Sequence, residues 1–282
     1  MRTIMRLAVM AVAVASAWAA VELPQASPAA TVSIKVGSTE VRLTYHRPGV
    51  KGRTIWGGLV PYGQVWRLGA NEATTIEVSD PVRIAGHDVP AGTYALFAIP
   101  GRQSWTFIVN KDAKQWGAFD YKQADDVARF EATPQTAPAQ EWMLLTVDPT
   151  GPQSAEVALA WEKLRVAFPI EVEVPSIVWG AITKRIAGPD ATWQDYFDGA
   201  RYSLDQGGHR AEALGWADRA VAAKPMFWTY EVKARVLQRE GRTAEALALL
   251  DKAMADATGK TPAEYIDELR ATAAEWRGAG KK

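Results

Sequence analysis

The chain divides into two halves with different hydrophobic periods. From Thr31 to about residue 174, apolar and polar residues alternate in short runs that end at glycine, proline, asparagine or aspartate. This period of two is typical of half-buried strands, and the spacing of the breaks is typical of an antiparallel Greek-key β-sandwich. The pattern predicts nine strands, at residues 32–36, 41–45, 74–78, 93–99, 105–110, 128–132, 141–147, 156–162 and 166–174.

Past Pro175, apolar residues recur every three to four positions, which indicates amphipathic helices. Ser176 is a candidate N-cap for a first helix over 177–187. Thr192, with Asp195 three residues later, forms a capping box for the second helix, which Gly207-Gly208 ends. The remaining helices are expected over 210–223, 227–240, 243–257, and from a capping box at Thr261-Pro262-Ala263-Glu264 to about Trp276.

The helical half contains an internal repeat with an offset of 33 residues. The segments EALGWADRA and EALALLDKA match Ala213 with Ala246, Ala217 with Leu250 and Ala220 with Ala253. Small residues at these positions let the two helices of a hairpin approach closely. The region 194–257 therefore resembles the tetratricopeptide repeat, whose period is about 34 residues. Arg201 and Ala234 depart from that family's usual glycines, and two repeats are few for a solenoid, so we expect the β domain or a partner to cover one end.

The first residues have the pattern of an export signal. Arg2 and Arg6 precede a short apolar run, and Ala17-Trp18-Ala19 forms a small-residue cleavage site. The pattern predicts removal of residues 1–19, a linker over 20–30, and no membrane span after cleavage, because the apolar run is too short to cross a bilayer. The sequence has no cysteine, so lipobox anchoring, disulfides and thiol catalysis are excluded. We expect a periplasmic or secreted bacterial protein.

Charge and motif content narrow the function. Loss of residues 1–19 would leave 30 basic and 32 acidic side chains, a balance without the electrostatic footprint of a nucleic-acid or anionic-membrane binder. The spacings of serine hydrolases, zinc proteases and phosphate-cradling loops do not occur. His46, His87 and His209 lie in different predicted elements, so no metal site and no cofactor are expected.

The run from Tyr45 to Thr75 is the densest in candidate binding chemistry. It combines arginine and lysine, which grip carboxylates, with tryptophan and tyrosine, which stack on sugar rings or cations. The chain has twelve tryptophans, which can serve either as bulky core residues or as binding platforms. The candidate ligand-binding residues are Tyr45, Arg47, Lys51, Arg53, Trp56, Trp66, Arg67, Asn71 and Glu72.

The sequence leaves several interpretations of this run open. The cations and tryptophans line a concave site for an envelope glycan or a carboxylate-ended peptide, or else Trp56 and Trp66 plug the end of the sandwich while the cations are solvated. Arg67 is also a candidate ion-pair partner for Glu72, which would fix the loop. A third interpretation is a hydrolase that uses Glu72 with the cations. The helical half is the candidate surface for another envelope protein.

The β half also resembles a known bacterial family, called domain of unknown function 2911. The resemblance spans about 31–174. The motif residues are Tyr45, Arg47-Pro48, Val50–Arg53, Trp56–Gly63, Val65–Arg67, Gly69–Thr74, Pro90–Tyr94, Leu96-Phe97, Ile99-Pro100, Trp105-Thr106, Lys111 and Trp116–Ala118. It implies an exported, mostly β protein, sometimes followed by tetratricopeptide-like helices, with no assigned activity. Together these features predict a β-sandwich over 31–174 and a helical domain over 175–282, with a binding or assembly role.

Overall fold

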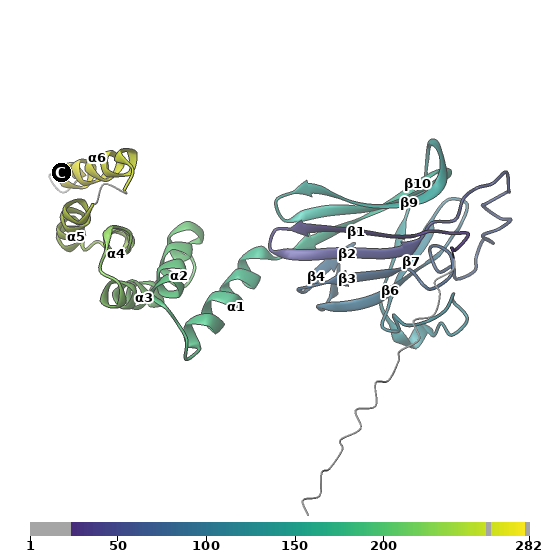
Figure 1. The fold of residues 1–282 in the computed structure, drawn as a ribbon, viewed down its shortest axis with the longest axis horizontal. Coiled ribbons are helices and arrows are strands. Elements are labelled where there is room, and N and C mark those ends of the chain that lie inside the picture. Colours follow the sequence, from purple (N-terminus) through teal and green to yellow (C-terminus); the bar gives the residue numbers. More distant parts are fainter. Residues whose placement is uncertain (1–23, 258–260, 280–282) are drawn as a thin grey trace, which may run out of the picture.

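A computed structural model describes residues 24–257 and 261–279 of the chain. Strands occupy the amino-terminal part of these residues and helices the carboxyl-terminal part (Figure 1). The predicted order of a β domain followed by an α domain is therefore confirmed. The predicted export signal, residues 1–19, lies outside the described residues.

The first of two antiparallel sheets has six strands in the order β1-β2-β3-β6-β7-β8. Its register is continuous from β2 to β7, since Thr44 pairs with Thr75, Thr75 with Ala95, and Ala95 with Asn110, and it shifts between β7 and β8 at Val109 and Asn110. The strands are β1 (Ala29–Val36), β2 (Thr39–His46), β3 (Thr75–Val78), β6 (Gly92–Ile99), β7 (Trp105–Asn110) and β8 (Asp126–Ala132).

The second sheet has four strands in the order β5-β4-β10-β9 and completes the sandwich. The chain crosses to it after β3, returns for β6, and crosses again after β8. The strands are β4 (Val82–Ile84), β5 (His87–Val89), β9 (Gln135–Gly151) and β10 (Ser154–Val172). The predicted antiparallel β-sandwich is confirmed.

The strand boundaries correct the sequence prediction in three places. β4 and β5 are too short, at three residues each, to show alternation in the sequence. Residues 156–162 and 166–174, predicted as two strands, belong largely to the single long strand β10. β1 begins at Ala29, inside the predicted linker over 20–30, because Ala29 pairs with His46 on β2.

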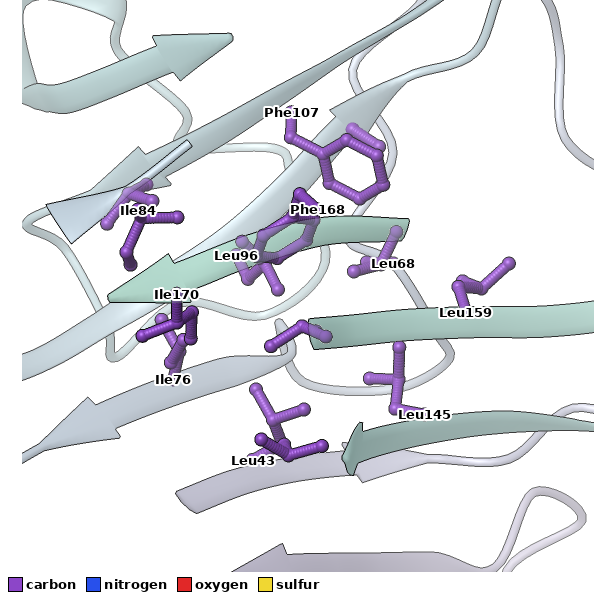
Figure 2. Packing of buried hydrophobic residues seen from close by; sticks show 14 of the residues in the cluster. Leu43, Leu68, Ile76, Ile84, Leu96, Phe107, Leu145, Leu159, Phe168 and Ile170 are labelled. Carbon is purple, nitrogen blue, oxygen red and sulfur yellow. The ribbon is translucent and has the colours of Figure 1, made fainter. Parts of the chain in front are cut away.

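Alternating apolar residues from both sheets form one core between them (Figure 2). Each fully buried leucine, isoleucine or phenylalanine contributes about 1.5–3 kcal/mol relative to an exposed side chain. The residues labelled in Figure 2 are Leu43, Leu68, Ile76, Ile84, Leu96, Phe107, Leu145, Leu159, Phe168 and Ile170. Nine of them come from strands, whereas Leu68 comes from the loop before β3.

Within the described residues, six α-helices follow the sandwich and extend away from one end of it (Figure 1). None of the helices in the described part of the chain is long and apolar enough to span a bilayer. The helices are α1 (Val174–Ala187), α2 (Trp193–Gln206), α3 (Arg210–Ala223), α4 (Phe227–Arg239), α5 (Thr243–Asp256) and α6 (Ala263–Ala279).

The helix starts agree with the predicted caps at one place and differ at another. Thr192 and Asp195 form the predicted capping box of α2, with the Asp195 carboxylate accepting the Thr192 amide at 2.6 Å. These hydrogen bonds lower the pKa of Asp195. Ser176 is not the cap of α1. That helix begins at Val174, with Glu173 at the cap position and Pro175 in the first turn, where a missing amide costs little.

The repeat positions fill the contacts between paired helices. Helix α2 packs on α3 and helix α4 on α5. The matched residues Ala213, Ala217, Ala220, Ala246, Leu250 and Ala253 are all buried. The 33-residue offset therefore reflects two similar helix pairs, while their likeness to tetratricopeptide repeats stays a prediction.

Candidate functional site

The segment before β3 makes an excursion out of the six-stranded sheet. Trp66 and Thr74 occupy neighbouring places beside β6, since the Trp66 carbonyl accepts from Ala98 N at 2.9 Å and the Thr74 carbonyl from Leu96 N at 2.7 Å. The residues between them leave the sheet and return. Thr74 N donates to the Arg67 carbonyl at 3.1 Å, and this hydrogen bond joins the two ends of the loop. We call residues 67–73 the excursion loop.

The backbone of the excursion loop is strained at two residues that are not glycine. Leu68 has φ 52° and Asn71 φ 58°, both in the left-handed region. Each such conformation costs on the order of 1–3 kcal/mol and persists only where its surroundings hold it. Leu68 is held because its side chain is fully buried in the core of Figure 2. Its carbonyl also accepts the Thr74 hydroxyl at 2.7 Å.

A second loop pairs with the excursion loop. Ala73 N donates to the Gln115 carbonyl and Gly117 N to the Asn71 carbonyl, each at 3.1 Å. Glu72 and Trp116 form an antiparallel bridge between these two hydrogen bonds. We call residues 115–119 the cover segment. It joins Arg67, Asn71 and Glu72 to aromatic residues about 45 positions later in the sequence.

A buried polar group fastens both ends of the loop that carries the cover segment. The Asp126 carboxylate, 7% exposed, accepts 2.8 Å hydrogen bonds from Asn110 Nδ2, Tyr121 OH and Arg129 Nη1. Asn110 precedes the loop, whereas Tyr121 lies within it and Asp126 follows it. We call these four residues the clasp. Burial and the hydrogen bond to Asp126 raise the pKa of Tyr121 to about 12.

Arg67 is the most unusual side chain of the excursion loop. Its Nε is buried and has no hydrogen-bond partner among the described residues. Burial lowers the pKa of Arg67 below its ordinary value. A Cβ atom built on Gly117 would lie 3.6 Å from Arg67 Nη1, so the guanidinium lies against the cover segment.

The considered ion pair between Arg67 and Glu72 does not form. The Glu72 carboxylate instead lies 3.4 Å from His46 Nδ1. Within the described residues, Arg67 has no carboxylate within ion-pair distance. The half-buried Asn71 side chain donates to Gln25 Oε1 at 2.7 Å. Arg67 is therefore a half-buried cation without a partner carboxylate.

The cover segment places two large aromatic side chains in solvent. Trp116 is 57% exposed and Phe119 is 83% exposed. The Phe119 ring lies close to Gly117, where a built Cβ would be 3.0 Å from Phe119 Cε2. The candidate residues chosen from the sequence did not include Gln115, Trp116 or Phe119. The available signals were the family motif at Trp116–Ala118 and the two aromatic residues, Trp116 and Phe119, just before Asp120.

Trp56 and Trp66 are half-buried and belong to a packed cluster of tryptophans. They pack with Trp105 and Trp161, with ring centroids 4.9–6.2 Å apart and mostly edge-to-face. Edge-to-face packing is favourable because the ring edges are positive and the faces negative. Of the two alternatives left open by the sequence, this packing favours tryptophans that plug the end of the sandwich.

Two of the candidate residues tie the end of β2 to β9. Tyr45 is buried, and its hydroxyl donates to the Leu145 carbonyl at 3.2 Å and accepts from Leu145 N at 3.1 Å. Arg47 Nε donates to the Met143 carbonyl at 2.8 Å. These hydrogen bonds use the donor and an acceptor of the Tyr45 hydroxyl and the Nε donor of Arg47. The structure therefore gives Tyr45 and Arg47 an architectural role.

Lys51 and Arg53 follow in the loop after β2, and both are exposed. The Lys51 ammonium lies 5.5 Å from the ring centre of Trp142, a cation–π distance. Arg53 Nη2 donates to the Gly49 carbonyl at 2.6 Å. Of the nine predicted residues, Arg67, Asn71 and Glu72 share the excursion loop, and the other six lie outside it.

The hollows away from this site include one in the β part and one among the helices. One, of about 870 Å³, is at the far end of β3 and is lined by the β4–β5 hairpin, residues 152–154 and residues 171–173. The walls of this hollow are mostly apolar. Two of its charged residues, Arg83 and Asp88, form an exposed pair and do not converge on the hollow. The other, of about 250 Å³, lies among α2, α4 and α6. The excursion loop and cover segment therefore form the better candidate for recognition of a polar ligand.

Comparison with known proteins adds the family. No curated protein and no solved structure matches the chain. The family described as protein of unknown function (DUF2911) matches residues 27–170, just over half of the chain, including the excursion loop, the cover segment and the clasp. The chain belongs to this family.

Proposed function

We propose that this chain is an exported binding protein of the bacterial cell envelope and that its sandwich binds a carboxylate-bearing ligand at Arg67. One observation carries the proposal. A half-buried guanidinium without a partner carboxylate lies against a segment that presents two exposed aromatic rings. The ligand is a glycan or a peptide that carries a carboxylate.

The energetics of Arg67 favour an anion as the ligand. Burial of a cation is unfavourable unless a charge or hydrogen bond compensates it. A carboxylate matches the two-pronged guanidinium with parallel hydrogen bonds, and charge-assisted bonds are stronger than neutral ones. Trp116 and Phe119 offer apolar surface beside this contact. The strained excursion loop holds Arg67 in place before the ligand arrives, which lowers the entropy cost of binding.

The export part of the proposal depends on residues 1–19 and on the absence of cysteine. Cell fractionation of the full chain and of a chain lacking residues 1–19 tests it. We expect the full chain in the periplasmic or secreted fraction, shortened at its amino terminus, and the shortened chain in the cytoplasm. Equal distribution of both would contradict export.

Binding is tested by calorimetric titration of the purified protein with carboxylate-bearing envelope fragments and their amidated counterparts. We expect the acids to bind and Arg67→Ala to weaken binding roughly 10- to 100-fold, as for loss of a charge-assisted hydrogen bond. Arg83→Ala is the matched control, because Arg83 lies at the other end of the sandwich in an exposed pair. If Arg67→Ala and Arg83→Ala bind every fragment equally, the proposal fails.

The same titration tests the hydrolase alternative. The contact between Glu72 and His46 is the observation that favours it, because a paired carboxylate and imidazole can exchange a proton. Mass spectrometry of the fragments after incubation distinguishes the two functions. Intact fragments support binding alone. Cleavage that disappears in Glu72→Gln would establish hydrolysis.

The helical part has its own candidate surface for an envelope protein. In the hollow among α2, α4 and α6, Arg235 reaches Glu231 on its own helix and Glu268 on α6, beside Trp228 and the 41% exposed Tyr265. Cross-linking in envelope extracts tests this surface. We expect partners of the full chain to be lost from a chain that ends at Ala187. Retention of all partners would contradict the proposal.

A further inference from the structure

The cover segment contains a second buried polar atom without a partner. Gln115 is 6% exposed, and its Oε1 has no hydrogen-bond donor among the described residues. Its Nε2 donates to the Asp112 carbonyl at 2.7 Å. This bond fixes the orientation of the amide, because the flipped side chain would place two acceptors against each other. Gln115 therefore offers a buried acceptor.

The unpaired acceptor of Gln115 and the unpaired donor of Arg67 belong to the same junction. Gln115 accepts the Ala73 amide through its backbone carbonyl, and Gly117, two residues on, lies against the Arg67 guanidinium. The two side chains do not hydrogen-bond each other. Buried polar groups are normally paired, and unpaired ones are unfavourable. A single ligand group that offers an acceptor to Arg67 and a donor to Gln115 would satisfy both.

Peptide carboxyl ends have this chemistry. The last residue of a peptide carries a carboxylate, which accepts, and an amide N–H, which donates, on the same Cα. A sugar acid lacks the N–H beside its carboxylate, and a free amino acid carries an ammonium there instead. We infer that the site binds the C-terminal residue of a peptide. Its carboxylate accepts hydrogen bonds from Arg67, and its amide N–H donates to Gln115 Oε1. This inference rests on the proposed function and selects the peptide as the ligand.

Access to the two buried atoms requires the cover segment to shift. Two backbone hydrogen bonds tie it to the excursion loop, and Gly117 has φ 70°, a conformation that glycine adopts without strain. The Phe119 ring over Gly117 is largely exposed, so its displacement loses little buried surface. Once displaced, Trp116 and Phe119 can contact the side chain of the last residue.

The test compares three small ligands on the purified full chain. N-acetyl-alanyl-alanine, in its L and D forms, carries both the carboxylate and the N–H. The matching depsipeptide replaces this N–H with an ester oxygen, and the C-terminal amide removes the carboxylate charge. We expect the dipeptide to bind at least about tenfold more tightly than the depsipeptide, as expected where a buried acceptor is left unpaired, and more tightly than the amide.

Gln115→Leu should bind the dipeptide and the depsipeptide equally, because its side chain cannot accept the N–H. Gln238→Leu is the matched control, since Gln238 lies on α4 and also has a buried, unpaired Oε1. Circular dichroism melting checks that both variants fold, and the comparison of ligands on the unmodified chain needs no variant.

The outcomes separate this inference from the proposed function. If the unmodified chain binds the dipeptide and the depsipeptide equally but rejects the amide, the inference fails and carboxylate binding stands. If it binds neither dipeptide form yet binds sugar acids through Arg67, the ligand is a glycan and the inference again fails. If no acid binds in an Arg67-dependent manner, both fail.

Discussion

Leu68 shows how a buried side chain can impose an unfavourable backbone. A leucine in the left-handed region is strained because its Cβ crowds the backbone. Complete burial of the same side chain in the core outweighs that strain. The backbone on either side of Leu68 is thereby fixed, and with it the position of Arg67. Asn71, the other strained residue, lacks such an anchor.

Asn71→Ala should therefore destabilise the protein, whereas Asn71→Gly should not. Asparagine tolerates the left-handed region, glycine adopts it freely, and alanine is penalised by about 1 kcal/mol. Both variants lose the exposed hydrogen bond to Gln25, so each controls for that loss in the other. Urea denaturation measures the free energies of unfolding. Equal values for the two variants would show that Asn71 is not strained in solution.

Tyr121 should titrate about two pH units above an ordinary tyrosine. Burial and the hydrogen bond to Asp126 raise its pKa to about 12, against about 10 in an unfolded chain. The folded state therefore holds this proton more tightly. The protonated Tyr121 hydroxyl contributes to the free energy of unfolding below pH 10, and this contribution is lost as the pH rises through 12. The pKa of Tyr121 is measured from the difference in phenolate absorbance between the native protein and Tyr121→Phe as the pH is raised. A difference spectrum with a midpoint near 10 would contradict the clasp.

The sequence indicated the segment that carries the candidate site, but it did not show which of its aromatic side chains are exposed. The density of arginine and tryptophan between Tyr45 and Thr75 predicted nine candidate residues, and the structure places three of them, Arg67, Asn71 and Glu72, together in the excursion loop. That density did not distinguish Trp66, whose ring packs on other tryptophans, from Trp116, whose ring is exposed. The spacing of residues in the sequence cannot make that distinction, because the exposure of a side chain depends on which distant residues pack against it in the fold.

At the scale of elements, the long strand β10 shows where alternation stops predicting boundaries. Glu162 has φ 56°, and the pairing with β9 shifts register on both sides of it. A bulge of this kind inserts an extra residue and exchanges the faces of the residues that follow. The apolar alternation therefore breaks although the strand continues. The prediction consequently divided one strand into two.

The clasp positions the cover segment, and Asp126→Ala should loosen it. Loss of this carboxylate leaves Arg129 and Tyr121 without their shared acceptor, which should cost about 1–3 kcal/mol of stability. Hydrogen exchange should quicken at the amides of Ala73 and Gly117, which join the two loops.

Asp88→Ala is the control for this experiment, because Asp88 pairs with Arg83 but is 91% exposed. Exposed ion pairs contribute little to stability, so exchange at the two loops should not change. If Asp126→Ala also leaves the exchange of Ala73 and Gly117 unchanged, the clasp does not position the cover segment.

At the scale of the whole molecule, helix α1 is the connection between the two parts. Val174 and Ile177 pack against the sandwich core, while Trp179 and Ile186 pack with the buried residues of α2, α3 and α4. The change of hydrophobic period near Pro175 lies within about two residues of the point where α1 begins. Periodicity succeeded there because each part buries its own core, so each keeps its own pattern.

A chain that ends at Ala187 should therefore keep the stability of the sandwich. It retains Val174 and Ile177, which complete the sandwich core, and it loses helices that have separate clusters of buried residues. Thermal denaturation followed at the strand signal in circular dichroism measures this. We expect the midpoint of the sandwich to move by less than about 3 °C, equivalent to about 1 kcal/mol for a domain of this size.

A chain that ends at Glu173 provides the contrast. The Val174 side chain lies directly over Gly37, where an added Cβ would clash with it, so its loss opens the core beside β1 and β2. That chain should melt at a clearly lower temperature than the chain ending at Ala187. If both shortened chains lose the transition of the sandwich, the helices are part of one cooperative unit, and the α1 contacts are not sufficient to complete the β domain.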